Sequence, residues 1–143
     1  MKKTILFITG IFLLTIVILT IMLINIQSNN KKLQQVNIDY EYYLNRTIFG
    51  TELATLINKA IDNNKRLEIS KDENGFYIAN DTDSILITIQ MLNVEENYQM
   101  EKIFALGTSQ FVELFNSSRF KSEQVTYHQK TGRIATILFK QVE

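Results

Sequence analysis

From Thr4 to Ile26 the sequence contains no charged residue and consists mainly of Ile, Leu, Phe, Val and Met. These 23 residues would span about 34 Å as a helix, slightly more than the hydrocarbon core of a bilayer, which is about 30 Å thick. Such a segment has to be helical in a bilayer, because its backbone groups can hydrogen-bond only within the helix. We therefore predict that residues 1–26 form a membrane anchor that contacts the lipid bilayer through Thr4 to Ile26.

A cleaved secretory signal peptide is the alternative to a retained anchor. The apolar region of a signal peptide is usually only about 7–15 residues long, and Ile26-Gln27-Ser28 is a poor cleavage site. Lys2, Lys3 and the terminal amine precede the apolar segment, whereas Lys31 and Lys32 follow it. This asymmetry favours a single-pass protein of the cell membrane, with its N-terminus in the cytoplasm and its C-terminal domain outside the cell.

The composition of the remaining chain excludes several classes of site. Residues 27–143 carry 13 basic and 15 acidic residues with never more than two like charges in a row, so we expect no nucleic-acid partner. The chain has no cysteine, which excludes disulfides and thiolate metal sites, and one histidine excludes zinc sites that need several imidazoles. We expect no cofactor. Twenty isoleucines, 13 asparagines and no proline indicate a bacterial genome of low GC content.

The anchor helix is predicted to continue into a juxtamembrane helix over residues 27–48. Apolar side chains recur there at spacings of three, four and three, as a narrow seam made of Leu33, Val36, Tyr40 and Tyr43. The seam either packs on the core of the domain or forms a short parallel coiled coil between copies of the chain. The seam spans only about two heptads, and a seam of that length is compatible with both alternatives.

A second helix begins after Phe49-Gly50, where Thr51 is a predicted N-cap and Glu52 is favourably placed near the helix N-terminus. We expect Asn63-Asn64 to end this helix, because Asn tolerates the left-handed cap conformation. Its buried stripe has the spacing of an amphipathic helix and comprises Leu53, Leu56, Ile57, Ala60 and Ile61.

From residue 65 onward the apolar period changes from helical to alternating. Strands are expected at Leu67–Ile69, Phe76–Ile78, Ile85–Leu92 and Phe120–Tyr127 with Arg133–Lys140, the last two forming a hairpin closed by Gly132. Residues 98–104 fit either a strand or a helix. A short helix is expected over Ser109–Asn116, with four side chains toward the sheet: Phe111, Val112, Leu114 and Phe115. The predicted fold of residues 49–143 is therefore a soluble α+β domain, with two further helices packed on a mostly antiparallel sheet that ends in a C-terminal hairpin.

The sequence offers little support for catalysis. His128 is the only imidazole, and no motif supplies a nucleophile or an orienting carboxylate for it. The acidic turns Asp72-x-Asn74-Gly75 and Asp81-x-Asp83 resemble calcium loops only in part, because neither continues to a bidentate Glu. Hydrogen bonds within the turns account for these acidic residues more simply. We predict that the chain is not an enzyme.

A partner surface is a further hypothesis. Tyrosines are common at binding surfaces, because one end of the side chain is apolar and the other is polar. Tyr40, Tyr42 and Tyr43 lie close together in the sequence, and His128 lies at the predicted hairpin edge. We therefore name Tyr40, Tyr42, Tyr43 and His128 as a possible partner surface. Self-association could use Leu33, Val36, Tyr40 and Tyr43.

The stretch from Phe49 to Asn64, FGTELATLINKAIDNN, and the later turn Tyr127-His128-x-Lys130-Thr131-Gly132 resemble a group of uncharacterised small single-pass membrane proteins of low-GC Gram-positive bacteria. This resemblance covers most of the chain and implies no activity.

The order of segments also resembles type IV pilin-like proteins, with a basic start, an apolar helix that runs into a soluble helix, and a small sheet. In that family a processing Gly is followed five residues later by a Glu used in assembly. Here Gly10 is followed five residues later by Thr15, and only two lysines precede Gly10. The resemblance implies a pilin-like or pseudopilin-like subunit as an alternative function.

These observations favour a membrane-tethered, non-catalytic interaction or structural module of the bacterial cell envelope. The two alternatives are a pilin-like subunit and an envelope enzyme whose site has no recognisable motif.

Overall fold

The computed structural model describes residues 2–92, 94 and 96–142, and within the first helix it leaves the side chains of Leu6, Asn29, Asn30, Lys32, Leu33 and Gln34 undescribed. The described residues form these elements in chain order: α1 (Lys2–Glu41), β1 (Thr47–Phe49), α2 (Gly50–Arg66), β2 (Leu86–Gln90), β3 (Asn97–Gln99), α3 (Met100–Leu106), α4 (Thr108–Phe115), β4 (Arg119–Tyr127) and β5 (Ile134–Gln141). The chain divides into two compact units, Met1–Gln35 and Val36–Glu143. The second unit is an α+β domain, as predicted.

The first unit is helical throughout its described part, and over Lys2–Ser28 it is long and apolar enough to cross a membrane. Three threonines in this stretch satisfy their hydroxyl groups inside the helix. Thr9, Thr15 and Thr20 each donate to a backbone carbonyl three or four residues earlier, over 2.9, 2.7 and 2.8 Å respectively. Their polar groups therefore need no partner from the surroundings, as a lipid environment requires.

The predicted juxtamembrane helix over residues 27–48 is too long at its C-terminal end. Helix α1 ends at Glu41, and residues 47–49 form strand β1 instead. Asn45 has φ of 56° in the turn between them, a conformation that Asn tolerates better than most residues. The turn buries Leu44 and Ile48 in the core of the domain, which a continuing helix would not do.

Helix α2 buries the predicted stripe completely: Leu53, Leu56, Ile57, Ala60 and Ile61. Its N-terminus differs from the prediction, because the carboxylate of Glu52 accepts a hydrogen bond of 2.9 Å from the backbone N–H of Phe49. The side chain that caps this helix is therefore Glu52 and not Thr51. The C-terminus was also predicted wrongly, since α2 continues past Asn63 and Asn64 to Arg66.

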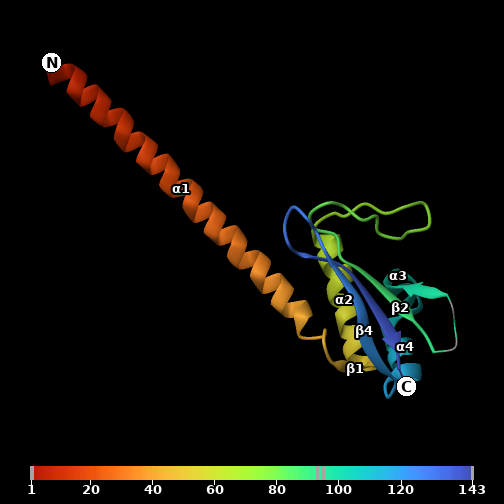
Figure 1. Ribbon diagram of the computed structural model, residues 1–143. Helices are drawn as coiled ribbons and strands as arrows, with labels where there is room; N and C mark the ends of the chain where they lie inside the picture. Colours follow the sequence, from red (N-terminus) through yellow and green to blue (C-terminus); the bar gives the residue numbers. More distant parts are fainter. Residues whose placement is uncertain (1, 93, 95, 143) are drawn as a thin grey trace. The chain divides into compact units, whose positions relative to one another are not determined.

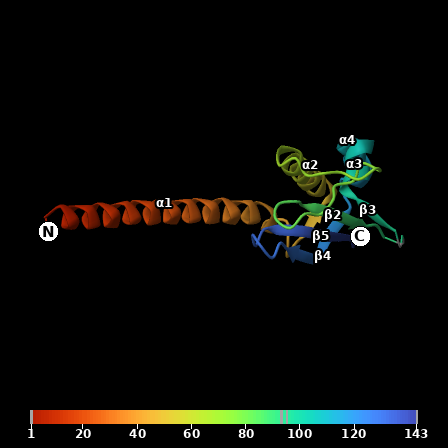
Figure 2. The same cartoon turned by 90° about the horizontal axis from the view of Figure 1, so that it is seen from above.

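The five strands form one sheet in the order β1-β4-β5-β2-β3. The pairs β1–β4, β4–β5 and β2–β3 are antiparallel and β2–β5 is parallel, so the sheet is mixed and mostly antiparallel. Helices α2, α3 and α4 lie on one side of the sheet (Figures 1 and 2). The core fills the space between these two layers, and its fully buried side chains include Ile48, Leu53, Leu56, Ile57, Ile85, Ile87, Ile89, Phe120, Ile137 and Phe139.

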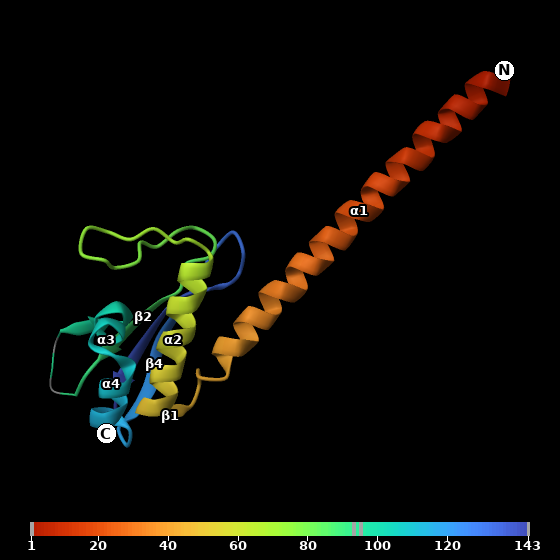
Figure 3. The same ribbon diagram turned by 180° about the vertical axis from the view of Figure 1, so that it is seen from behind.

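The C-terminal hairpin is present as predicted, with Gly132 at φ of 67° in its turn. The expected hairpin from Leu67–Ile69 to Phe76–Ile78 is wrong, because only an isolated bridge between Lys71 and Tyr77 forms there. The ambiguous segment 98–104 divides between β3 and α3. The segment 67–84 instead runs as a loop that reaches the β4–β5 turn at one end of the domain (Figure 3).

Gly50 begins α2 at a point of close contact with the end of α4. A Cβ atom at this position would lie 1.9 Å from the carbonyl oxygen of Phe115 and 2.7 Å from its carbonyl carbon. The backbone N–H of Gly50 also donates to the carbonyl of Ser118 over 3.1 Å. The start of α2 and the end of α4 can therefore approach each other only through a residue without a side chain.

We predict that Gly50→Ala destabilises the domain by about 2–4 kcal/mol, because the new methyl group meets backbone atoms that cannot rotate away. Urea unfolding of the full chain in detergent micelles, followed by far-UV circular dichroism, measures this change. Thr51→Ala is the matched control, since Thr51 is exposed in the same helical turn, and it should change stability by less than about 0.5 kcal/mol. Equal stability of the two variants would contradict the close approach.

Candidate functional site

The residues predicted as a partner surface do not form one surface. Tyr40 is only 2% exposed and His128 is also buried, whereas Tyr43 is half-buried and packs against the core. Tyr42 alone is well exposed, at 61%. Its ring lies edge-on to Tyr43 with centroids 5.1 Å apart, and the guanidinium of Arg46 lies 4.1 Å from its centroid.

The apolar seam at the end of α1 is used within the domain. Tyr40 belongs to the core, and Val36 and Tyr43 are partly buried against it. The side chain of Leu33 lies outside the described residues. Of the two alternatives for the seam, packing on the chain's own core is therefore the one that the described residues display.

The end of α1 is also held to the C-terminal hairpin by hydrogen bonds. The side-chain amide of Asn37 donates to the carbonyl of Gly132 over 2.8 Å and accepts from the backbone N–H of Ile134 over 3.0 Å. Asn37 thereby satisfies backbone groups at the hairpin turn that have no strand partner on that side.

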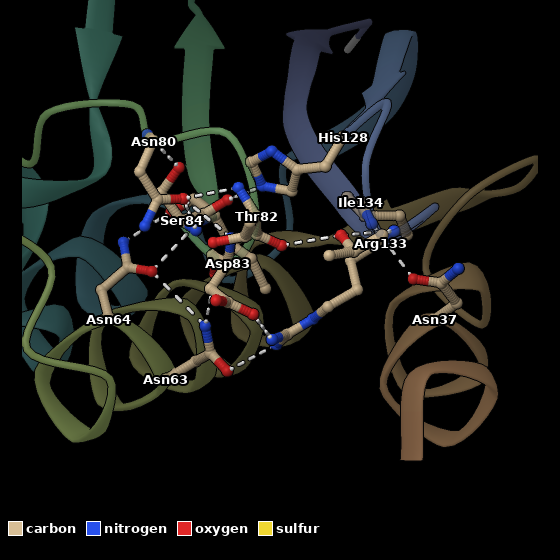
Figure 4. Close-up of polar contacts among 12 residues, drawn as sticks. Asn37, Asn63, Asn64, Asn80, Thr82, Asp83, Ser84, His128, Arg133 and Ile134 are labelled. Carbon is tan, nitrogen blue, oxygen red and sulfur yellow. Dashed lines mark hydrogen bonds and ion pairs between the residues drawn. The ribbon is translucent and has the colours of Figure 1, made fainter. Parts of the chain in front are cut away.

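A network of buried polar groups surrounds this junction (Figure 4). Its innermost member is Asn64, which is fully buried. The Asn64 amide donates to the carbonyl of Ile85 over 2.7 Å and accepts from the N–H of the same residue over 2.9 Å. The side chain thus pairs with Ile85 as a neighbouring strand would, just before β2 begins. This role explains why α2 does not end at Asn63-Asn64: both side chains point into the domain.

Arg133 occupies the other side of the network. Its guanidinium forms an ion pair with Asp83 and donates to the Asn63 side-chain oxygen over 3.2 Å, and Arg133 itself is buried. Asn63 in turn donates to the carbonyl of Asp83 over 3.3 Å. A buried guanidinium is tolerated only with such partners, because leaving its charge unpaired would cost several kcal/mol. Arg133 therefore fixes the end of the 67–84 loop to α2.

His128 completes the network from the hairpin. Its Nε2 lies 2.7 Å from the carbonyl oxygen of Ser84. A carbonyl oxygen can only accept, so Nε2 carries the hydrogen and is the donor. The backbone of His128 is equally engaged, with its N–H bonded to the Arg133 carbonyl and its carbonyl bonded to the Gly132 N–H, both over 2.8 Å. His128 lies at the hairpin, as predicted, and holds the turn to the loop before β2; because it is buried, it does not belong to an exposed partner surface.

The acidic turns are occupied by internal hydrogen bonds and ion pairs. Asp72 accepts from the backbone N–H groups of Asn74 and Phe76 over 2.9 and 2.8 Å. Asp81 pairs with Lys130 over 2.7 Å, and the hydrogen bond from Lys130 lowers the pKa of the Asp81 carboxyl. Among the described residues no group of three or more His, Cys, Asp or Glu side chains could hold a metal ion. These turns therefore have structural partners that account for them.

The network joins the end of α1, the end of α2, the 67–84 loop and the hairpin through side-chain hydrogen bonds and an ion pair. We call this network the polar latch. Every polar side chain described in it has a partner within the domain, and its one imidazole donates from Nε2 to a carbonyl oxygen. The sequence contained one signal for it, since Asn64 follows Ala60 and Ile61 at the spacing of the buried stripe of α2.

A polar hollow of about 490 Å³ is lined by the last turns of α1 and by α2. Its charged lining residues are Asp39, Lys59, Asp62 and Arg66, and Asp39 pairs with Lys59 over 2.9 Å. Two cations and two anions share the lining, so the hollow favours an ion of neither charge.

An apolar hollow of about 410 Å³ lies beside α3 and α4, and none of the described residues that line it is charged. Tyr98, Phe111 and Phe115 contribute to its walls. Leu106 and Leu114 also line it, yet they are 73% and 75% exposed. The prediction that Leu114 faces the sheet was wrong, because α4 turns this side chain outward. We call the surface formed by Tyr98, Leu106, Gln110, Phe111, Leu114 and Phe115 the α3–α4 apolar patch.

Comparison of the chain with models of known protein families, with curated proteins and with solved structures found no match.

We predict that Asn64→Leu destabilises the domain by about 3 kcal/mol, because it leaves the N–H and C=O of Ile85 buried without partners. Urea unfolding of the full chain in micelles measures the change. Asn58→Leu is the control, since Asn58 is a half-buried residue of the same helix with only a long bond of 3.4 Å to Thr108. Its effect should stay below about 1 kcal/mol, and an equal loss in both variants would contradict the role assigned to Asn64.

We predict that Tyr40→Phe leaves the domain as stable as the natural chain at neutral pH, or more stable by about 1 kcal/mol. The Tyr40 hydroxyl is buried without a hydrogen-bond partner among the described residues, and burial raises the pKa of this phenol. The phenol of Tyr40 therefore has a higher pKa in the folded domain than in the unfolded chain, where a tyrosine pKa is about 10. Above about pH 10 the unfolded chain loses this proton first, so the domain becomes less stable as the pH rises.

The advantage of Tyr40→Phe should therefore grow in urea titrations above about pH 10. Tyr42→Phe, at an exposed ring, is the matched control for the loss of a tyrosine hydroxyl at neutral pH. A loss of more than about 1 kcal/mol in Tyr40→Phe at neutral pH would mean that the hydroxyl has a strong partner.

Proposed function

We propose that the protein is a membrane-tethered, non-catalytic interaction module of the bacterial cell envelope, with its N-terminus in the cytoplasm and its α+β domain outside. The observation that carries this proposal is helix α1, which contains the apolar segment and whose last turns, through Val36 and Tyr40, belong to the core of the domain. The helix that contains the apolar segment thus also contributes residues to the core of the domain.

The use of the polar side chains supports a non-catalytic role. The single histidine donates to the backbone of Ser84, and the buried arginine is paired with Asp83. Both side chains are needed to hold loops together. General acid–base catalysis would require a titratable group that can reach a substrate, and neither group meets this requirement in its present bonds.

The exposed surface supports an interaction role. In the part of the seam that the structure describes, Tyr40 is buried and Val36 and Tyr43 are partly buried against the core. Exposed sites for contact on the described surface of the domain include the ring of Tyr42 and the α3–α4 apolar patch. Exposed apolar patches that line a hollow are common at protein–protein contacts.

Cysteine labelling tests the proposed orientation, because the chain has no cysteine of its own. We predict that Gln129→Cys, in the exposed β4–β5 turn, reacts with a membrane-impermeant maleimide on intact bacterial cells that express the full chain. The mass of the labelled protein should be that of the full chain. A cysteine inserted after Met1 is the matched control and should react only after permeabilisation.

The other outcomes separate the alternatives. Reaction of Gln129→Cys only after lysis would place the domain in the cytoplasm and overturn the proposal. A labelled mass reduced by residues 1–10 would support processing after Gly10 and therefore the pilin-like alternative. Residues 80–84 are unsuitable for the probe, because Asn80 accepts hydrogen bonds from the N–H groups of Thr82, Asp83 and Ser84.

A further inference from the structure

The α3–α4 apolar patch is an exposed feature of the described domain that its fold does not explain. Leu106 is the last residue of α3, and Gly107, with φ of 97°, forms the corner before α4. The corner directs Leu106 outward on one side of the hollow, and Leu114 projects from the last turn of α4. Two leucines with about three-quarters of their surface exposed, at the rim of one hollow, form an apolar surface ready to be covered.

The chemistry of the patch favours a protein over a lipid surface as its partner. Helices that lie on membranes carry Lys or Arg on the polar face beside the apolar one. Helix α4 has the sequence TSQFVELF, with one acidic and no basic residue. None of the described residues that line the hollow is charged. An uncharged aliphatic and aromatic surface is suited to another surface of the same kind.

A second copy of the chain meets these requirements with no further component. A two-fold symmetric contact uses the same patch on both copies, so the patch must offer both a projection and a hollow. The α3–α4 apolar patch offers both, in Leu106 and Leu114 and in the hollow that they border. The described lining residues are uncharged, and the exposed Glu113 beside Leu114 lies outside the lining.

The size of the patch connects this contact to the anchor. Twelve residues line the hollow, whereas a stable interface usually has about 20–30 residues on each side. Such a patch alone would give weak association in solution. Anchoring in one membrane holds copies in the same orientation and raises their effective concentration, which converts a weak contact into a populated one.

We propose that the α3–α4 apolar patch binds the same patch of a second copy, so that two anchored chains pair about a two-fold axis along the membrane normal. This inference rests on the proposed function, and it names the partner of the interaction module.

Site-specific photo-crosslinking tests the pairing. A photoreactive amino acid replaces Gln110, an exposed lining residue of the hollow, in full chains with two different tags expressed together in a bacterial host. We expect an adduct that contains both tags, at a yield at least about tenfold above that from the same probe at Glu123 on β4. Adding Leu114→Glu should lower the yield about tenfold or more, because an unpaired charge is costly in an apolar contact. The matched control is Ile78→Glu, at an exposed loop residue that does not line the hollow, and it should leave the yield unchanged.

The remaining outcomes overturn the pairing in distinguishable ways. An adduct of one tagged chain with another protein, without mixed-tag adduct, would refute the second copy as partner and leave the interaction module standing. Equal yields from Gln110 and Glu123 would show that the patch meets no partner in the membrane. Persistence of the mixed-tag adduct in Leu114→Glu would place the contact elsewhere on the domain. The cysteine labelling tests the proposed function separately from this pairing.

Discussion

Strand β2 begins directly after a residue whose two backbone hydrogen bonds come from a side chain and not from a strand. The amide of Asn64 satisfies both backbone groups of Ile85, at the point where the chain returns from the 67–84 loop to the sheet. Because Asn64 lies on α2, the bond sets the position of the helix along the sheet as well as the start of β2. Apolar packing alone would allow α2 to slide, since aliphatic contacts have little directional preference.

The polar latch and the apolar core have different tasks in the same domain. Burial of the α2 stripe and of the sheet residues supplies most of the stabilisation, at roughly 1.5–3 kcal/mol for each large aliphatic side chain. The hydrogen bonds of Arg133, His128 and Asn37 fix how the segments are oriented, because each bond joins segments that are far apart in the chain. Paired polar groups of this kind add specificity to a fold, and here they hold the end of the long loop against α2 and the hairpin.

Periodic features of the fold were predictable from the sequence, and features that rest on single side chains were not. The α2 stripe, the alternation in β2 and the C-terminal hairpin follow from spacing and from Gly132. Asn63 and Asn64 were predicted to cap α2, because their preference for helix ends is a local property that tertiary hydrogen bonds override. For the same reason a buried His128 was mistaken for a surface residue. The exposure of Leu114 was not predicted, because hydrophobic residues of an amphipathic helix are normally expected to face the core.

Asn37 gives the end of α1 a second connection to the sheet. The covalent path from α1 into the sheet runs through the 42–46 turn to β1, which is an edge strand. The side chain of Asn37 provides a second path, directly to Gly132 and Ile134 at the start of β5, an inner strand. The end of α1 is therefore connected both to the edge of the sheet, through the chain, and to its interior, through a side chain.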